Sequence, residues 1–185
     1  FLDWPTDGTK DAVSGTALLI LCAAQKLKEC AGSAADGATI SSLNRKLSRY
    51  LTEKTAAKQI AAFQVFCGTT TDRQKTLLER GGASGFSTFM SYFILKALSA
   101  TGCDRTTEII KEYYGGMLSR GATTFWEDFD ISWLDGSGRI DEIPDPEKKD
   151  LHADYGRFCY KGLRHSLCHG WSSGVVPFFI EETVG

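Results

Sequence analysis

The chain has 185 residues, of which 42% are hydrophobic, so it is long enough for one sizeable core and too short for two ordinary domains. Its formal net charge of -2 supplies no field that would gather a polyanion, which argues against nucleic acid as a partner. The longest apolar run, residues 17–24, is far shorter than the roughly 18 to 20 residues that span a bilayer, so we expect no membrane segment.

The first predicted helix covers residues 9–31. Asp7 or Thr9 can serve as its N-cap, and Gly32 stands where a left-handed residue would end it. Its apolar residues wrap most of the way round, which indicates a helix buried between neighbours. Further helices are predicted over residues 38–51, 54–67 and 72–80.

The clearest helical pattern follows, because apolar residues recur at the i, i+3, i+4, i+7 spacing until Gly102 stops them. The residues of this stripe are Phe86, Phe89, Met90, Phe93, Ile94, Ala97 and Leu98. Asp104 can cap the next helix, whose end we expect to be loosened at Gly115 and Gly116. Strand signals are nearly absent, so the chain is predicted to be one all-α unit of helical hairpins over residues 1–185, either a bundle or a toroid.

Residues 121–160 lack helical periodicity, and irregular stretches this long in a compact domain are typically functional or disordered. This one has too many aromatic residues to be simply disordered, and we expect most of its acidic residues to be solvated. Within this stretch, residues 121–130 read Gly-Ala-Thr-Thr-Phe-Trp-Glu-Asp-Phe-Asp and place carboxylates beside a tryptophan. Glycoside hydrolysis uses paired carboxyl groups, and aromatic rings cover the apolar faces of sugars. The alternative interpretation makes Trp126 and Phe129 core residues and Glu127 a surface or ion-paired acid.

A second motif, His-Ser-Leu-Cys-His-Gly-Trp-Ser-Ser at residues 165–173, precedes a final predicted helix that Ser172 or Ser173 can cap. His169 could donate a hydrogen bond to a sugar hydroxyl. Alternatively, the histidines are satisfied side chains of a packed C-terminal segment. Zinc binding is not expected, because there is no paired Cys-x-x-Cys, and no cofactor motif is present either.

The six cysteines lack the density and regular spacing of small disulfide-rich folds. Cys22 and Cys30 fall on one predicted helix, where a rise of about 1.5 Å per residue puts them roughly 12 Å apart, too far to bridge each other. We therefore interpret the six as mostly buried thiols. The cysteines therefore do not determine whether the protein is cytoplasmic, periplasmic or secreted.

Three segments together resemble bacterial α-L-rhamnosidases of the six-hairpin glycosidase superfamily: Phe-Leu-Asp-Trp-Pro at residues 1–5, Gly-Ala-Thr-Thr-Phe-Trp-Glu at 121–127 and His-Ser-Leu-Cys-His-Gly-Trp at 165–171. The likeness runs across essentially the whole chain. It implies an (α/α)6 toroid of which these residues form about the last half, the C-terminal portion of one catalytic domain. Because the chain begins with Phe rather than Met, we expect it to be a piece of a longer protein.

The resemblance also implies the roles of individual residues. Glu127 would be the general base of an inverting hydrolysis of terminal α-L-rhamnosides, with the general acid on an upstream segment. Trp4 would stack on the sugar and His169 would bind a hydroxyl, with Asp3 and Trp126 close by. The expected partners are a carbohydrate substrate and either the missing half of the domain or a second copy of the chain.

Two alternatives to this hypothesis stay open. The chain could be a non-catalytic helical module that binds a carbohydrate or a partner chain, or a six-hairpin glycosidase that acts on another sugar.

Overall fold

All regular structure is helical within residues 9–34, 36–52, 54–143, 145–148, 150–151 and 166–183, which the computed structural model describes. The predicted all-α class is therefore confirmed for this part of the chain. The longer helices are α1 (Lys10–Ala31), α2 (Gly37–Leu47), α3 (Lys58–Phe66), α4 (Asp72–Glu79), α5 (Ser91–Ala100), α6 (Thr106–Ser119) and α7 (Val175–Thr183).

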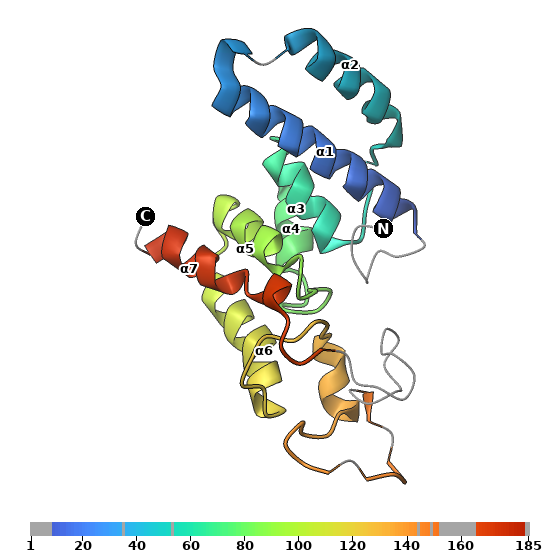
Figure 1. Ribbon diagram of the computed structural model, residues 1–185, viewed down its shortest axis with the longest axis vertical. Coiled ribbons are helices and arrows are strands. Elements are labelled where there is room, and N and C mark those ends of the chain that lie inside the picture. The colour runs from blue at the N-terminus through green and yellow to red at the C-terminus, as the bar shows by residue number, and fades with distance from the viewer. Residues whose placement is uncertain are drawn as a thin grey trace.

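Consecutive helices pair with one another, as expected of helical hairpins. Contacts join α1 to α2, α3 to α4, and α5 to α6, while α3 also packs against both α1 and α5. The last helix, α7, lies against α5, although α6 comes between them in the sequence (Figure 1). The two ends of the described chain are thus joined through α3 and α5.

The first helix has the predicted bounds but not the predicted environment. It begins after Thr9 and ends at Gly32, which has a φ of 53°. Leu18 is buried, but Leu19 and Ile20 are 38% and 41% exposed. The prediction that α1 is buried all round is therefore wrong for this structure, because α2 and α3 cover only part of its surface.

Two other helices begin later than predicted, because local hydrogen bonds compete with the first helical turn. The backbone N–H of Ala57 donates to the Thr55 hydroxyl at 2.9 Å, and α3 starts only at Lys58. In the next hairpin, residues 88–90 form a turn, and the Ser91 hydroxyl donates to the carbonyl of Thr88 at 2.8 Å. Most of the predicted stripe nevertheless faces inward, since Phe86 and Met90 are fully buried, but Phe89 is exposed.

The helix α6 differs from the prediction at both ends. Arg105, not Asp104, occupies its N-cap position, and the helix continues through Gly115 and Gly116 to Ser119. A Cβ at Gly116 would lie 3.1 Å from the Phe129 ring. This glycine therefore allows the segment after Glu127 to approach the helix closely, and it does not end the helix.

The cysteines are more accessible than predicted. Among the five in the described residues, Cys103 is buried, Cys22 and Cys67 are partly exposed, and Cys30 and Cys168 are exposed. The interpretation of mostly buried thiols is therefore wrong for these five.

Candidate functional site

The segment that carries Glu127 leaves α6 through a glycine turn. Gly121 has a φ of 87°, a left-handed conformation that residues with a Cβ rarely adopt. The N–H groups of Gly121 and Ala122 donate back to the carbonyls of Leu118 and Met117 at 3.0 and 3.1 Å, which closes the last turn of α6. The chain is thereby redirected, and residues 122–130 cross the end of the helical hairpin.

Two aromatic residues anchor this segment in the core. Trp126 and Phe129 are 0% and 1% exposed, and their rings meet edge to face with centroids 5.8 Å apart. The Tyr113 hydroxyl, from α6, donates to the carbonyl of Phe129 at 2.8 Å. The structure therefore places Trp126 beneath the site as a core residue, and not on a surface that a sugar could reach.

The second motif lies directly beside the first. The backbone N–H of Glu127 donates to the carbonyl of Ser166 at 2.8 Å, and the N–H of His169 donates to the carbonyl of Phe125 at 2.7 Å. The Ser172 hydroxyl donates to the carbonyls of Trp126 and His169. This hydroxyl is therefore occupied and does not cap α7, which begins at Val175 after the short 3-10 turn η6 (Gly170–Ser172).

Glu127 is held by hydrogen bonds at both its backbone and its side chain. Its carbonyl accepts from the Thr88 hydroxyl at 2.5 Å and from the Trp171 indole Nε1 at 2.8 Å. Its carboxylate oxygen Oε2 accepts from the backbone N–H of Ser166 at 2.9 Å. Within the described residues, Oε1 has no hydrogen-bond partner, and the side chain is partly exposed. One oxygen is therefore oriented while the other can accept a hydrogen bond from water.

Three partly exposed rings lie in a row that meets the Glu127 backbone, because the Trp171 indole donates to the Glu127 carbonyl. The Trp171 ring lies 4.7 Å from that of His169 and 5.5 Å from that of Phe89, centroid to centroid. Trp171 is 38% exposed and Phe89 is 37% exposed. These rings form an aromatic row beside Glu127, a surface suited to the apolar face of a sugar.

Two predicted site residues are not described by the structure, and a carboxylate next to Glu127 faces the core. Asp3 and Trp4 lie outside the described residues. Asp128 is 6% exposed, and its carboxylate accepts from the backbone N–H of Phe129 at 2.9 Å. It therefore faces the core beside its own backbone and does not lie across a substrate from Glu127.

Sequence reasoning missed Thr88, Phe89 and Ser166 as parts of this site. Phe89 was assigned to the core stripe of a helix, and the backbone N–H of Ser166 acts independently of its side chain. Trp171 was noted only for lying in a motif with His169. Phe89 follows the buried Phe86 at the i+3 position, where a helical pattern predicts a second buried residue. The sequence therefore gives no signal that Phe89 is exposed.

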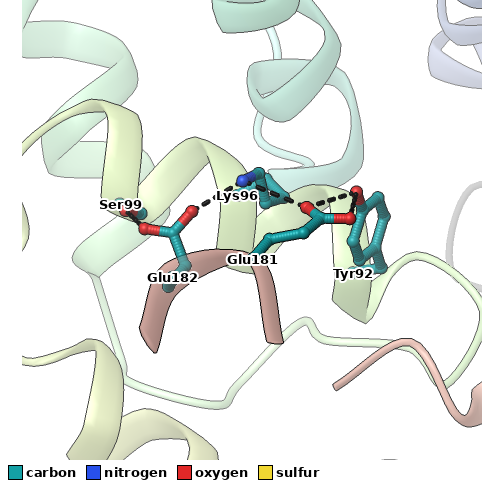
Figure 2. Close-up of polar contacts among 5 residues, drawn as sticks. All are labelled: Tyr92, Lys96, Ser99, Glu181 and Glu182. Atoms are coloured by element: carbon teal, nitrogen blue, oxygen red, sulfur yellow. Dashed lines mark hydrogen bonds and ion pairs between the residues drawn. The ribbon is translucent and has the colours of Figure 1, made fainter. Parts of the chain in front are cut away.

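An ionic contact joins the end of the helix α7 to α5 (Figure 2). Lys96 Nζ lies 2.6 Å from Glu182 Oε1 and 3.2 Å from Glu181 Oε2. The Tyr92 hydroxyl donates to Glu181 at 2.9 Å, and the Ser99 hydroxyl donates to Glu182. The hydrogen bond from Lys96 and then that from Ser99 lower the pKa of the Glu182 carboxyl.

A lowered pKa of Glu182 predicts acid sensitivity of the α7 contact. The stabilisation is fully present above the unfolded-state pKa of about 4.3 and is lost as pH falls through the lower folded-state pKa. Because the carboxylate is near the surface, we expect Glu182→Gln to lower Tm by only about 1 to 3 °C at pH 7 and to make the loss of Tm between pH 5 and 3 shallower. Differential scanning fluorimetry across that range measures both effects.

The control for this experiment is Glu147→Gln, which removes an exposed carboxylate with no ion pair among the described residues. It should leave the Tm profile unchanged. Equal profiles for the wild type and Glu182→Gln would contradict the predicted role of this contact.

In the described part of the chain, no group of three or more His, Cys, Asp or Glu side chains could hold a metal ion. No helix there is both long and apolar enough to cross a membrane. No protein-family model, curated protein or solved structure matches the chain. The site itself and its two motifs, residues 121–130 and 165–173, are therefore the features that bear on function.

Proposed function

We propose that the chain carries the catalytic base of an inverting glycoside hydrolase that acts on terminal α-L-rhamnosides. The observation that supports this most is the Glu127 carboxylate, held through Oε2 by the Ser166 N–H beside the exposed rings of His169 and Trp171. An oriented carboxylate next to an aromatic surface is what base-catalysed attack of water on a sugar requires.

In this mechanism, Oε1 of Glu127 takes a proton from a water molecule while the water oxygen attacks the anomeric carbon. The glycosidic bond breaks, and a general acid protonates the departing oxygen. In inverting enzymes this second carboxyl lies roughly 6.5 to 9.5 Å from the base, across the sugar. Asp128 is not suited to that role, since it is buried beside the backbone of Phe129. We place the acid on a segment upstream of these residues.

We further propose that the helical hairpins belong to an (α/α)6 toroid. The pairing of α1 with α2, α3 with α4 and α5 with α6 supports this arrangement, in which further hairpins would close the ring. The toroid would place the Glu127 segment at the end of a hairpin, where loops surround the ring's opening.

The experiment that tests the function uses the protein expressed from its complete coding sequence, on a panel of aryl glycosides that includes the α-L-rhamnoside. NMR identifies the anomer released first. Release of β-L-rhamnose from the α-linked substrate is expected, because inversion follows from a single attack by water. Retention of configuration would contradict the proposed role of Glu127, and inversion on a different glycoside would replace rhamnose with that sugar.

A second candidate function is a module that binds carbohydrate without cutting it. The exposed row of Phe89, Trp171 and His169 favours it, because aromatic rings bind sugars without any need for a catalytic acid. The two functions are separated by what Glu127→Gln removes: a hydrolase should lose turnover, whereas a pure binding module has no turnover to lose and should bind sugar as before. Absence of turnover on every glycoside of the panel would also favour this candidate.

Two exposed apolar surfaces predict association with other protein surfaces. On α1, Val13 and Leu27 are 54% and 62% exposed; near α7, Leu118 and Ile180 are 65% and 56% exposed. A pocket of about 350 Å³ lined mainly by apolar side chains lies between α6, residues 122–125 and α7. We propose that further hairpins of the same domain, or a second copy of the chain, cover these surfaces.

We accordingly expect the isolated 185-residue chain to self-associate with increasing concentration, as sedimentation velocity would measure. Leu27→Glu should weaken this association, because it places a charge in the exposed apolar surface of α1. Glu29→Gln, an exposed position on the same helix, is the control and should not weaken it. A monomer at every concentration would contradict the prediction.

A further inference from the structure

Two cysteines that are distant in sequence lie in contact where α1 packs against α3. The sulfur atoms of Cys22, in the middle of α1, and Cys67, at the C-cap of α3, are 2.6 Å apart and separated by 45 residues in sequence. Each thiol also approaches a backbone carbonyl of the opposite helix, Cys22 that of Phe63 at 3.6 Å and Cys67 that of Leu18 at 3.7 Å. The packing of the two helices therefore directs the two side chains toward each other.

We propose that Cys22 and Cys67 form a disulfide-bonding pair that joins α1 covalently to the end of α3 when a disulfide oxidant is present. A disulfide has a sulfur–sulfur length of about 2.04 Å, so the two atoms need to close by only about 0.6 Å from 2.6 Å. The helices already pack against each other, so no rearrangement of the fold is needed. This inference does not depend on the proposed function.

The surroundings of Cys67 give the oxidant a route to one of the two sulfurs. A pocket of about 450 Å³ lies between α1, α2 and the end of α3, and Cys67 lines it together with Lys28 and Thr69. The contact with Cys22 lowers the pKa of the Cys67 thiol, while the same contact and then burial raise that of Cys22. Because Cys67 lines the pocket, it is the thiolate that attacks first, and Cys22 is the resolving thiol.

The reaction with oxidised glutathione proceeds in two balanced exchanges. The Cys67 thiolate attacks one glutathione sulfur, forms a mixed disulfide and releases one glutathione thiolate. Cys22 then gives up its proton and attacks the Cys67 sulfur, which forms the Cys22–Cys67 bond and releases the second glutathione. The protein loses two protons and two electrons, and one molecule of oxidised glutathione becomes two molecules of reduced glutathione.

Tryptic mapping without reduction can test this directly, because cleavage after lysine and arginine separates the relevant cysteines. Cys22 falls in the peptide 11–26, Cys30 in 29–45 and Cys67 in 59–73. After oxidation with glutathione disulfide and alkylation of the remaining thiols, we expect peptide 11–26 linked to 59–73 and peptide 29–45 recovered alkylated. Recovery of both 11–26 and 59–73 in alkylated form, or linkage of either to 29–45, would overturn the proposal.

Variants separate the two roles. Cys22→Ser should trap glutathione on Cys67, whereas Cys67→Ser should remain unmodified at Cys22; the reverse pattern would overturn the assigned order of attack. Cys30→Ser is the matched control and should form the cross-link as the wild type does. Oxidation should raise the Tm of wild type and Cys30→Ser by about 5 to 15 °C and leave that of Cys67→Ser unchanged. An equal rise in Cys67→Ser would also count against the pair.

Discussion

Replacing Glu127 with glutamine is expected to lower kcat on the preferred aryl glycoside by about 10²- to 10⁴-fold, the range that a general base contributes. Glutamine keeps the size of the side chain, and its amide oxygen can still accept from the Ser166 N–H that holds Oε2 at 2.9 Å. It cannot accept a proton from water at neutral pH. The effect should therefore appear in kcat, with little change in KM or in Tm.

A small strong nucleophile distinguishes lost chemistry from lost structure in this variant. Azide attacks the anomeric carbon without a base, so it should restore turnover in Glu127→Ala, where the missing carboxylate leaves room for it. Inversion predicts a glycosyl azide with the configuration opposite to that of the substrate. A product of retained configuration would make Glu127 the acid–base residue of a retaining enzyme instead.

The matched control is Asp135→Asn, which removes an exposed carboxylate on the 3-10 turn η4 (Ile131–Gly136), a few residues further along the same segment. Its kcat should stay within about twofold of the wild type, since an exposed side chain away from the reacting atoms contributes little to the chemical step. Full activity of Glu127→Gln would show that Glu127 is not the catalytic base.

The helical class and the order of the helices could be predicted from sequence, because long apolar stripes at helical spacing dominate the chain. The starts of α3 and α5 could not, although the bounds of α1 were predicted. Local contacts decided these starts: the Thr55 hydroxyl delays α3, and the turn before Ser91 delays α5. Gly116 has no side chain, which allows the Phe129 ring to pack closely against α6. This is a tertiary contact, so the periodicity of the sequence does not predict it.

The candidate site was predictable in part. Its two motifs could be identified from residue types, and the structure brings Glu127 and His169 together through the backbone contacts of Ser166 and Phe125. Which aromatic side chain of each motif faces outward was not predictable, because residues 122–130 follow neither a helical nor a strand period. Trp126 turns into the core and Trp171 stays at the surface, although each lies in one of the two motifs.

The burial of Trp126 leads to the second large prediction: Trp126→Ala should lower the free energy of unfolding by about 3 to 5 kcal/mol. The side chain is 0% exposed and contacts Phe129, which in turn packs on Tyr113. Alanine would leave a cavity beneath the Glu127 segment, and the packed helices could fill it only in part. Urea denaturation followed by circular dichroism measures the change, with an unchanged m value if the unfolded state is unaffected.

Trp171→Ala is the comparison that separates core packing from sugar contact. Trp171 is 38% exposed, so this variant should lose only about 1 kcal/mol, mainly through the indole hydrogen bond to the Glu127 carbonyl, while binding sugar more weakly. Trp126→Phe should recover part of the stability lost in Trp126→Ala, because a smaller ring still fills some of the cavity. If Trp126→Ala instead kept its stability and raised KM, the indole would face the sugar, as the family resemblance implies. The assignment of Trp126 to the core would then be wrong.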